Sequence, residues 1–186
     1  MLWILLVLAV AILVGVLRGG KLRNLTEIRV RGWWLLLVGF GLQIVAGYLP
    51  VDRHDLAVAL VLVSYLPLLL VVWLNRQYAG MWIAGIGILM NFTVIALNSG
   101  MPVMAEAVHL AGGSGDLVLD AKHVLLTDDT RLPFLADIIP LPGSVISLGD
   151  VFLAIGVGAF LEDQMRRPLP LFRHKVQGMP GSAAGN

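Results

Sequence analysis

The sequence contains no cysteine, which excludes disulfide bonds, thiol nucleophiles and cysteine-bound metals. Charged residues are also scarce, at 13% of 186 residues, whereas hydrophobic residues make up 58%. Soluble domains carry about 25% charged residues, so the composition departs far from that class. The sequence also lacks close-spaced metal ligands such as HExxH and a glycine-rich phosphate loop that follows a strand. We therefore expect no metal centre and no cofactor.

Five long apolar stretches contain neither lysine nor arginine. A helix needs about 20 apolar residues to cross roughly 30 Å of hydrocarbon. We expect an all-α membrane bundle of five spans at about residues 1–17, 33–50, 56–74, 79–98 and 144–161, within one domain of residues 1–167. The first stretch has no basic residue ahead of it and no small-residue cleavage pattern, so it reads as an uncleaved span.

Positive and negative charges occupy different connections between these stretches. Ten of the thirteen Lys/Arg lie in residues 18–32, at residue 76 and after residue 165, whereas eight of the twelve Asp/Glu lie in residues 51–55 and 99–143. The positive-inside rule predicts an outer N-terminus and a cytoplasmic C-terminus in a bacterial cytoplasmic (inner) membrane. The basic residues lie against the membrane, which favours lipid as a partner and not nucleic acid.

The outer loop at residues 99–143 is too long for a bare connection. Pro102 and an apolar rhythm predict a short helix at Met101–Leu110, and a second is expected at Leu117–Leu126 beyond a glycine-rich break. His109 and His123 lie in these two helices and are interpreted as solvated surface residues. The apolar segment 133–140 is expected either to dip into the outer interface or to pack on the bundle. The Pro-, Gly- and Ser-rich tail at residues 168–186 is expected to be disordered.

Polar side chains recur at one depth in four of the five spans. At 1.5 Å per helical residue, all of them lie roughly 10–13 Å below the outer surface. They are Gln43, Ser64, Tyr65, Asn91 and Asp150. Small residues flank Gln43 and Asn91 on the same helix faces, which predicts that these faces point inward. The layer is either interhelical hydrogen bonding or part of a site, and Asp150 can also stabilise the N-terminus of its helix.

Three short pieces resemble the motifs of the lipoprotein signal peptidases, which are membrane aspartyl proteases. Asn98-Ser99-Gly100 is similar to their Asn-x-Gly segment, and Asp137 and Asp150 are similar to their two catalytic aspartates. The resemblance implies a catalytic dyad of Asp137 and Asp150. The chain departs from that family because no span separates Asn98 from Asp137, and because Ser147 stands where those enzymes have asparagine.

Over its whole length the chain more closely resembles an uncharacterised bacterial integral-membrane family, domain of unknown function 5317. The runs 98–103 and 146–150 carry this resemblance. It implies the membrane topology and no activity.

The sequence favours a non-catalytic function. We expect a binding or accessory subunit that presents an acidic and polar site outward, to a lipid, a ligand or a membrane-protein partner. The expected ligand-binding residues are Asn98, Gly100, Asn91 and Gln43, together with the two aspartates. The alternative is hydrolysis of a membrane-anchored substrate by the Asp137/Asp150 dyad, and a small-solute transporter is the third hypothesis.

Overall fold

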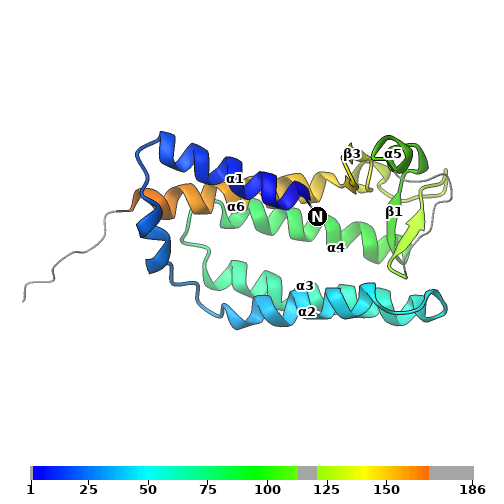
Figure 1. The fold of residues 1–186 in the computed structure, drawn as a ribbon. Helices are drawn as coiled ribbons and strands as arrows, with labels where there is room; N and C mark the ends of the chain where they lie inside the picture. The colour runs from blue at the N-terminus through cyan, green and yellow to red at the C-terminus, as the bar shows by residue number, and fades with distance from the viewer. Residues whose placement is uncertain (1, 113–120, 168–186) are drawn as a thin grey trace, which may run out of the picture.

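The structure, a computed structural model, describes residues 2–112 and 121–167 (Figure 1). The predicted disordered tail and the glycine-rich break from residue 113 onward lie outside the described residues. The α-helices are α1 (Leu2–Leu17), α2 (Trp34–Gly47), α3 (His54–Leu74), α4 (Met81–Asn98), α5 (Ala105–Leu110) and α6 (Leu148–Arg166). The 3-10 turns are η1 (Leu22–Glu27), η2 (Val51–Arg53) and η3 (Pro133–Leu135), and the strands are β1 (Met101–Val103), β2 (His123–Leu125), β3 (Ile139–Leu141) and β4 (Ser144–Ile146).

The five long helices run side by side along one elongated bundle (Figure 1). The helix α1 packs on α6, α6 packs on α4, α4 packs on α3, and α3 packs on α2. The buried apolar cluster lies mainly between α3 and α4, where Val61, Leu68 and Ile88 are almost inaccessible. The mostly helical architecture expected from the sequence is therefore confirmed.

Small residues let α4 and α6 approach closely. A methyl group added at Gly87 of α4 would overlap the carbonyl oxygen of Gly149 in α6, and one added at Gly156 of α6 would overlap the backbone of Ala84. This contact confirms that the stripe of Ala84, Gly87 and Asn91 faces inward, as small residues at membrane-helix interfaces do. It also brings the first turn of α6 directly against the side chain of Asn91.

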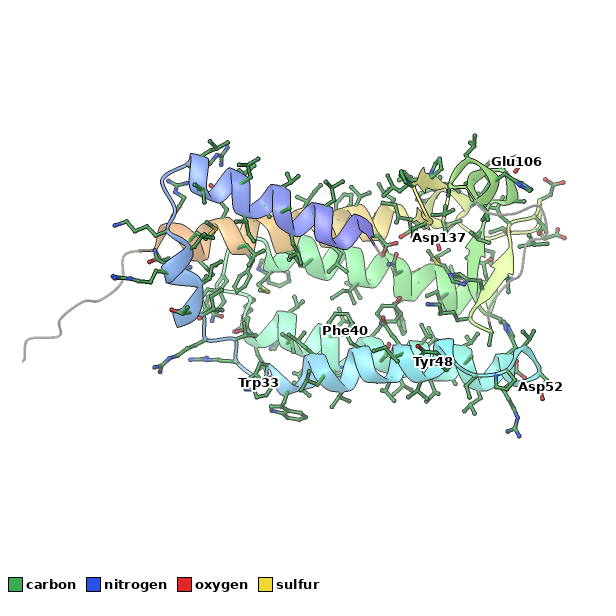
Figure 2. All side chains as sticks on the ribbon, viewed as in Figure 1. Trp33, Phe40, Tyr48, Asp52, Glu106 and Asp137 are labelled. Carbon is green, nitrogen blue, oxygen red and sulfur yellow. The ribbon has the colours of Figure 1, made fainter. Side chains whose placement is uncertain are left out.

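The two ends of the bundle differ in charge and in aromatic content. The basic turn with η1, the α3–α4 turn and the C-terminal end of α6 meet at one end, and Asp52 and Glu106 lie at the other (Figures 1 and 2). Exposed Trp33, Trp73 and Trp82 lie toward the basic end. Each end therefore gathers the connections that the charge pattern assigned to it.

Length and hydropathy allow two of the described helices to cross a membrane. These are the helical segment Val51–Leu74 and α4, and shorter apolar helices lie at Leu6–Leu17 and Trp34–Gly47. Helices of this length and hydropathy are compatible with membrane association. The count of five spans and the outer N-terminus stay predictions.

The outer loop contains strands where the sequence predicted helices. Residues 101–103 form β1, and the helix α5 begins only at Ala105. Residues 123–125 of the second predicted helix form β2, which pairs in parallel with β1 so that Met101 lies opposite His123. Pro102 has no backbone N–H to donate to a helix or to a neighbouring strand. A short two-stranded sheet tolerates proline where no N–H is needed for pairing. The predicted helix start at Pro102 is therefore wrong.

The last long helix also begins later than expected. Residues 144–146 form β4, which pairs antiparallel with β3, and α6 begins at Leu148 after the cap residue Ser147. The side chain of Ser147 accepts a hydrogen bond from the N–H of Asp150, and the Asp150 carboxylate accepts one from the N–H of Ser147. This reciprocal cap is the reason for the late start. Asp150 therefore lies in the first turn of its helix and not six residues inside a span.

Candidate functional site

A polar cavity lies where α2, α3, α4 and α6 meet the described part of the outer loop (residues 99–112 and 121–143), called the outer segment below. Its volume is about 160 Å³. It is lined by Gln43, Val61, Tyr65, Asn91, Ile95, Met101, Lys122, His123, Asp137 and Asp150. Four of the five residues of the predicted polar layer line it, and the fifth, Ser64, accepts a hydrogen bond from Gln43 at 3.1 Å. The prediction that these side chains share one level is confirmed.

Asp150 is held by hydrogen bonds on both of its carboxylate oxygens. Its Oδ1 accepts from the amide of Asn91 at 2.9 Å, and its Oδ2 accepts from the N–H of Ser147 at 3.0 Å. The Ser147 hydroxyl donates to the side-chain oxygen of Asn91 at 2.9 Å and closes the network. Both Ser147 and Asn91 are buried. The network fixes the start of α6 against α4, so Asp150 serves first as a cap and an interhelical acceptor.

Asp137 enters the cavity from the outer segment. Its N–H donates to the carbonyl of Pro102 at 2.9 Å, and its own carbonyl accepts from the N–H of Met104 at 3.0 Å, so β1 fixes its backbone. The residue is only 7% exposed. Its Oδ2 lies 3.6 Å from Nε2 of His123, and its buried Oδ1 has no hydrogen-bond partner among the described residues. A buried acceptor without a partner is costly, which marks Oδ1 as the atom that a bound donor would satisfy.

Burial raises the pKa of the Asp137 carboxyl above its ordinary value of 3.8, and the charge of Asp150 raises it further. The hydrogen bond from His123, with the charges of His123 and Lys122, opposes this shift. The folded protein therefore holds this proton more tightly than the unfolded chain does. Stability from the protonated carboxyl is fully present at acidic pH and is lost as the pH rises from the unfolded pKa through the folded pKa.

We expect this pH-dependent loss of stability to be absent in Asp137→Asn, because an asparagine side chain does not titrate. The free energy of unfolding in detergent, measured by SDS titration at a series of pH values, should fall for the parent relative to Asp137→Asn as the pH rises above about 4. Asp128→Asn, at an exposed site in the same outer segment, is the matched control and should follow the parent. A constant difference between the parent and Asp137→Asn would contradict the shift.

The segment around Asp137 packs on the bundle, which decides between the two expectations for residues 133–140. Leu135, Ala136 and Asp137 are buried, and the turn η3 contacts α4 and α6. The labelled Asp137 lies between the helix ends and the outer strands (Figure 2).

Asn98 and Gly100 lie outside the cavity wall and have structural contacts. The Asn98 side chain donates to the carbonyl of Arg131 at 2.9 Å and accepts from its N–H at 2.8 Å. Gly100 has a φ of +149°, and a methyl group there would lie 2.8 Å from a side-chain carbon of Val124. The structure thus brings Gln43, Asn91, Asp137 and Asp150 together in the cavity and places Asn98 and Gly100 where α4 leads into the outer segment.

Sequence reasoning missed two polar residues of the cavity and one structural residue. His123 was interpreted as a surface residue, but its side chain is 26% exposed and lines the cavity with Lys122. The pairing of β2 with β1 places both side chains in the cavity wall. The sequence predicted a helix at these residues and so did not predict this position. His109 is exposed as expected. Ser147 was noticed only as a departure from the peptidases, although a serine three residues before an acid is a helix-start signal.

Residues 27–161 match the model of a family that is described as a family of unknown function (DUF5317). The chain belongs to this family. A protein of Thermotoga maritima described as an uncharacterized protein is 32% identical over 160 residues, which cover 83% of this chain and 87% of that protein. No solved structure matches the chain. Every residue that lines the polar cavity falls within the DUF5317 match. The cavity is therefore formed by the family's own domain and not by an addition to it.

Proposed function

We propose that this DUF5317 protein is a multi-pass protein of the bacterial cytoplasmic membrane that binds a small polar ligand in an outward-facing cavity. Two long apolar helices, two shorter ones and the separation of charge between the ends of the bundle support the membrane location. In this orientation the basic end faces the cytoplasm and the cavity opens toward the outer end.

The Oδ1 of Asp137, for which the described part of the chain offers no hydrogen-bond partner, carries the binding hypothesis. This oxygen is buried in a cavity that also contains amide, hydroxyl, imidazole and ammonium groups. Drug-sized ligands occupy pockets of about 300–1,000 Å³, whereas water takes about 30 Å³ per molecule. A cavity of about 160 Å³ therefore suits a small solute, or the terminal group of a larger molecule, that donates a hydrogen bond to Asp137.

The test is a binding screen on the purified full-length protein with ammonium, methylammonium, guanidinium and urea as probes. We expect at least one probe to raise the thermal unfolding midpoint of the parent. Asp137→Asn should weaken that probe's binding by about tenfold or more, because a hydrogen bond to a charged group contributes about 1.5–3 kcal/mol. Asp128→Asn, which is exposed, should bind as the parent does. Stabilisation that is independent of Asp137 would exclude this site.

A membrane aspartyl hydrolase is the second candidate, because Asp137 and Asp150 line one cavity and the charge of Asp150 acts on Asp137. Two coupled carboxyls can divide the roles of acid and base. This mechanism requires that Asp137→Asn and Asp150→Asn each abolish cleavage of a membrane-anchored peptide while both variants stay folded. An accessory subunit instead predicts a membrane-protein partner that co-purifies with the parent and with either variant.

A further inference from the structure

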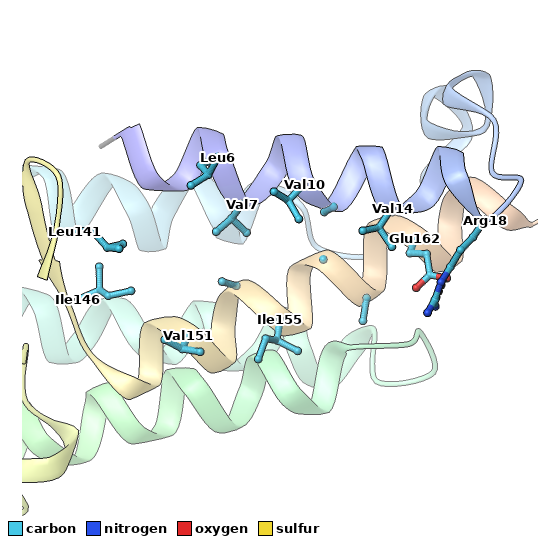
Figure 3. Close-up of a pocket in the computed structure, with 14 residues that line it drawn as sticks. Leu6, Val7, Val10, Val14, Arg18, Leu141, Ile146, Val151, Ile155 and Glu162 are labelled. Atoms are coloured by element: carbon cyan, nitrogen blue, oxygen red, sulfur yellow. Dashed lines mark hydrogen bonds and ion pairs between the residues drawn. The ribbon is translucent and has the colours of Figure 1, made fainter. Parts of the chain in front are cut away.

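We propose that the groove between α1 and α6 is a binding site for one acyl chain of an anionic phospholipid, whose headgroup lies at the basic end of the bundle. The groove has a volume of about 580 Å³ and is lined almost entirely by apolar side chains. Val7, Val10 and Val14 of α1 face Val151 and Ile155 of α6 across it (Figure 3). This inference rests on the membrane location in the proposed function and is independent of the polar cavity.

The dimensions of the groove suit an acyl chain. Along α1 it extends from Leu6 to Arg18, which is about 18 Å at 1.5 Å per residue. One leaflet of a bilayer contributes about 15 Å of hydrocarbon. The helices α1 and α6 touch directly where Gly15 packs on Met165, so the groove between them is narrow at that end. The occupant is therefore slender and apolar.

Charge at one end of the groove selects the headgroup. Arg18 and Arg166 both contact the same oxygen of Glu162, at 3.0 and 3.2 Å, and both are more than half exposed. The backbone N–H of Lys21 donates to the carbonyl of Met165. The exposed Lys21 is therefore a third cation at this end of the groove. Asp163 is paired with Arg167 at 2.6 Å. Among the described residues, Arg18 and Arg166 thus share the Glu162 carboxylate, and Lys21 is held at the same end of α6 by its backbone. The surplus positive charge suits a lipid phosphate.

Different elements lie at the two ends of the groove. The Arg18–Glu162 pair lies at the basic end, and Leu141 and Ile146 of the β3–β4 hairpin lie at the other (Figure 3). A chain seated in the groove would therefore have its polar end beside the arginines and its methyl end against the hairpin. A lipid in this site would stabilise the packing of α1, which contacts α6 as its main helical neighbour.

The test is native mass spectrometry of the full-length protein, released from nanodiscs of equal phosphatidylglycerol and phosphatidylcholine. We expect one retained phosphatidylglycerol per chain. The double variant Arg18→Gln/Arg166→Gln should lower the preference for phosphatidylglycerol by roughly 30-fold, since each arginine contributes about fivefold near an anionic surface. Arg76→Gln, a cation at the same end but outside the groove, is the matched control and should keep the preference.

A second variant tests the apolar part of the site without changing its charge. Ala154→Phe fills the groove and should remove retention of both lipids, whereas Leu89→Phe adds the same ring to an exposed position on α4 and should not. Equal retention of the two lipids by the parent, or retention that survives Ala154→Phe, would overturn the proposal. So would a dimer that Ala154→Phe dissociates, because a second copy would then be the occupant.

Failure of this inference is distinguishable from failure of the proposed function. Carbonate extraction of cell membranes reports whether the parent is an integral membrane protein. A parent that is extracted as soluble protein overturns both proposals. A parent that stays in the membrane but shows no lipid preference overturns the lipid site alone, because the binding screen on Asp137 uses a cavity that shares no lining residue with the groove.

Discussion

Gly87→Ala is expected to lower the free energy of unfolding by about 3 kcal/mol, which is at the upper end of the cost of overpacking a core. The added methyl group would overlap the carbonyl oxygen of Gly149 and lie 2.6 Å from the amide nitrogen of Leu153. Both atoms belong to the backbone of α6, so no side-chain rotation relieves the overlap. The helices α4 and α6 must move apart, and this movement loosens the first turn of α6 and its hydrogen bonds to Asn91.

Gly41→Ala is the matched control for this prediction. Gly41 also lies inside a helix, α2, and a methyl group added there meets no atom within 4 Å. Alanine should stabilise that helix by about 0.5–1 kcal/mol, because glycine loses more conformational freedom on folding. The two substitutions are chemically identical and differ only in the space around the added methyl group. SDS titration in detergent should therefore show unfolding midpoints that shift in opposite directions. Equal effects would mean that the close approach of α4 and α6 does not determine stability.

Asp150→Ala has the second large expected effect, a loss of about 3 kcal/mol. The substitution removes the acceptor for the amide of Asn91 and for the N–H of Ser147, at a place where Asn91 and Ser147 are buried. Each buried donor left without a partner costs about 1–3 kcal/mol, and loss of a helix cap alone costs about 1 kcal/mol. The start of α6 should therefore fray, which faster hydrogen exchange at the backbone amides of positions 150 and 151 would show directly.

Asp163→Ala is the control in the same helix. Asp163 pairs with Arg167, the residue after α6, at a partly exposed position, so its removal should cost less than about 1 kcal/mol. Comparing Asp150→Ala with Asp150→Asn then separates a structural from a catalytic role for Asp150. If Asp150→Ala destabilises α6 as expected while Asp150→Asn keeps the ligand response of the cavity, Asp150 is a positioning residue. Similar stability of Asp150→Ala and Asp163→Ala would instead contradict the capping role.

These predictions rest on residues that the sequence identified to different degrees. The depths of Gln43 and Asn91 follow from helix geometry, because each helical residue advances by a constant distance, whereas Asp150 reaches the same level from the first turn of α6. Their meeting in one cavity is confirmed. The stripe of small residues on α4 likewise follows from the spacing of residues that share a helix face. For these features a local, periodic pattern contains the necessary information.

The outer segment could not be predicted in the same way. Its two helices were inferred from Pro102 and from apolar rhythm, but β1 and β2 are held by hydrogen bonds between segments that are far apart in the chain. Three-residue strands are too short to show an alternating pattern, and their partners cannot be read from local sequence. The positions of Lys122 and His123 in the cavity wall depend on this pairing, and so they were missed.

The helical character of this DUF5317 protein, the separation of its charges and the inward faces of its long helices all follow from its sequence, because they depend on composition and on the fixed geometry of a helix. The arrangement of the candidate site does not. Tertiary folding places Asp137 against β1, sets His123 3.6 Å from its carboxylate and leaves the other carboxylate oxygen buried without a partner among the described residues. Burial and partnership are properties of contacts between distant segments, and no periodicity within one segment encodes them.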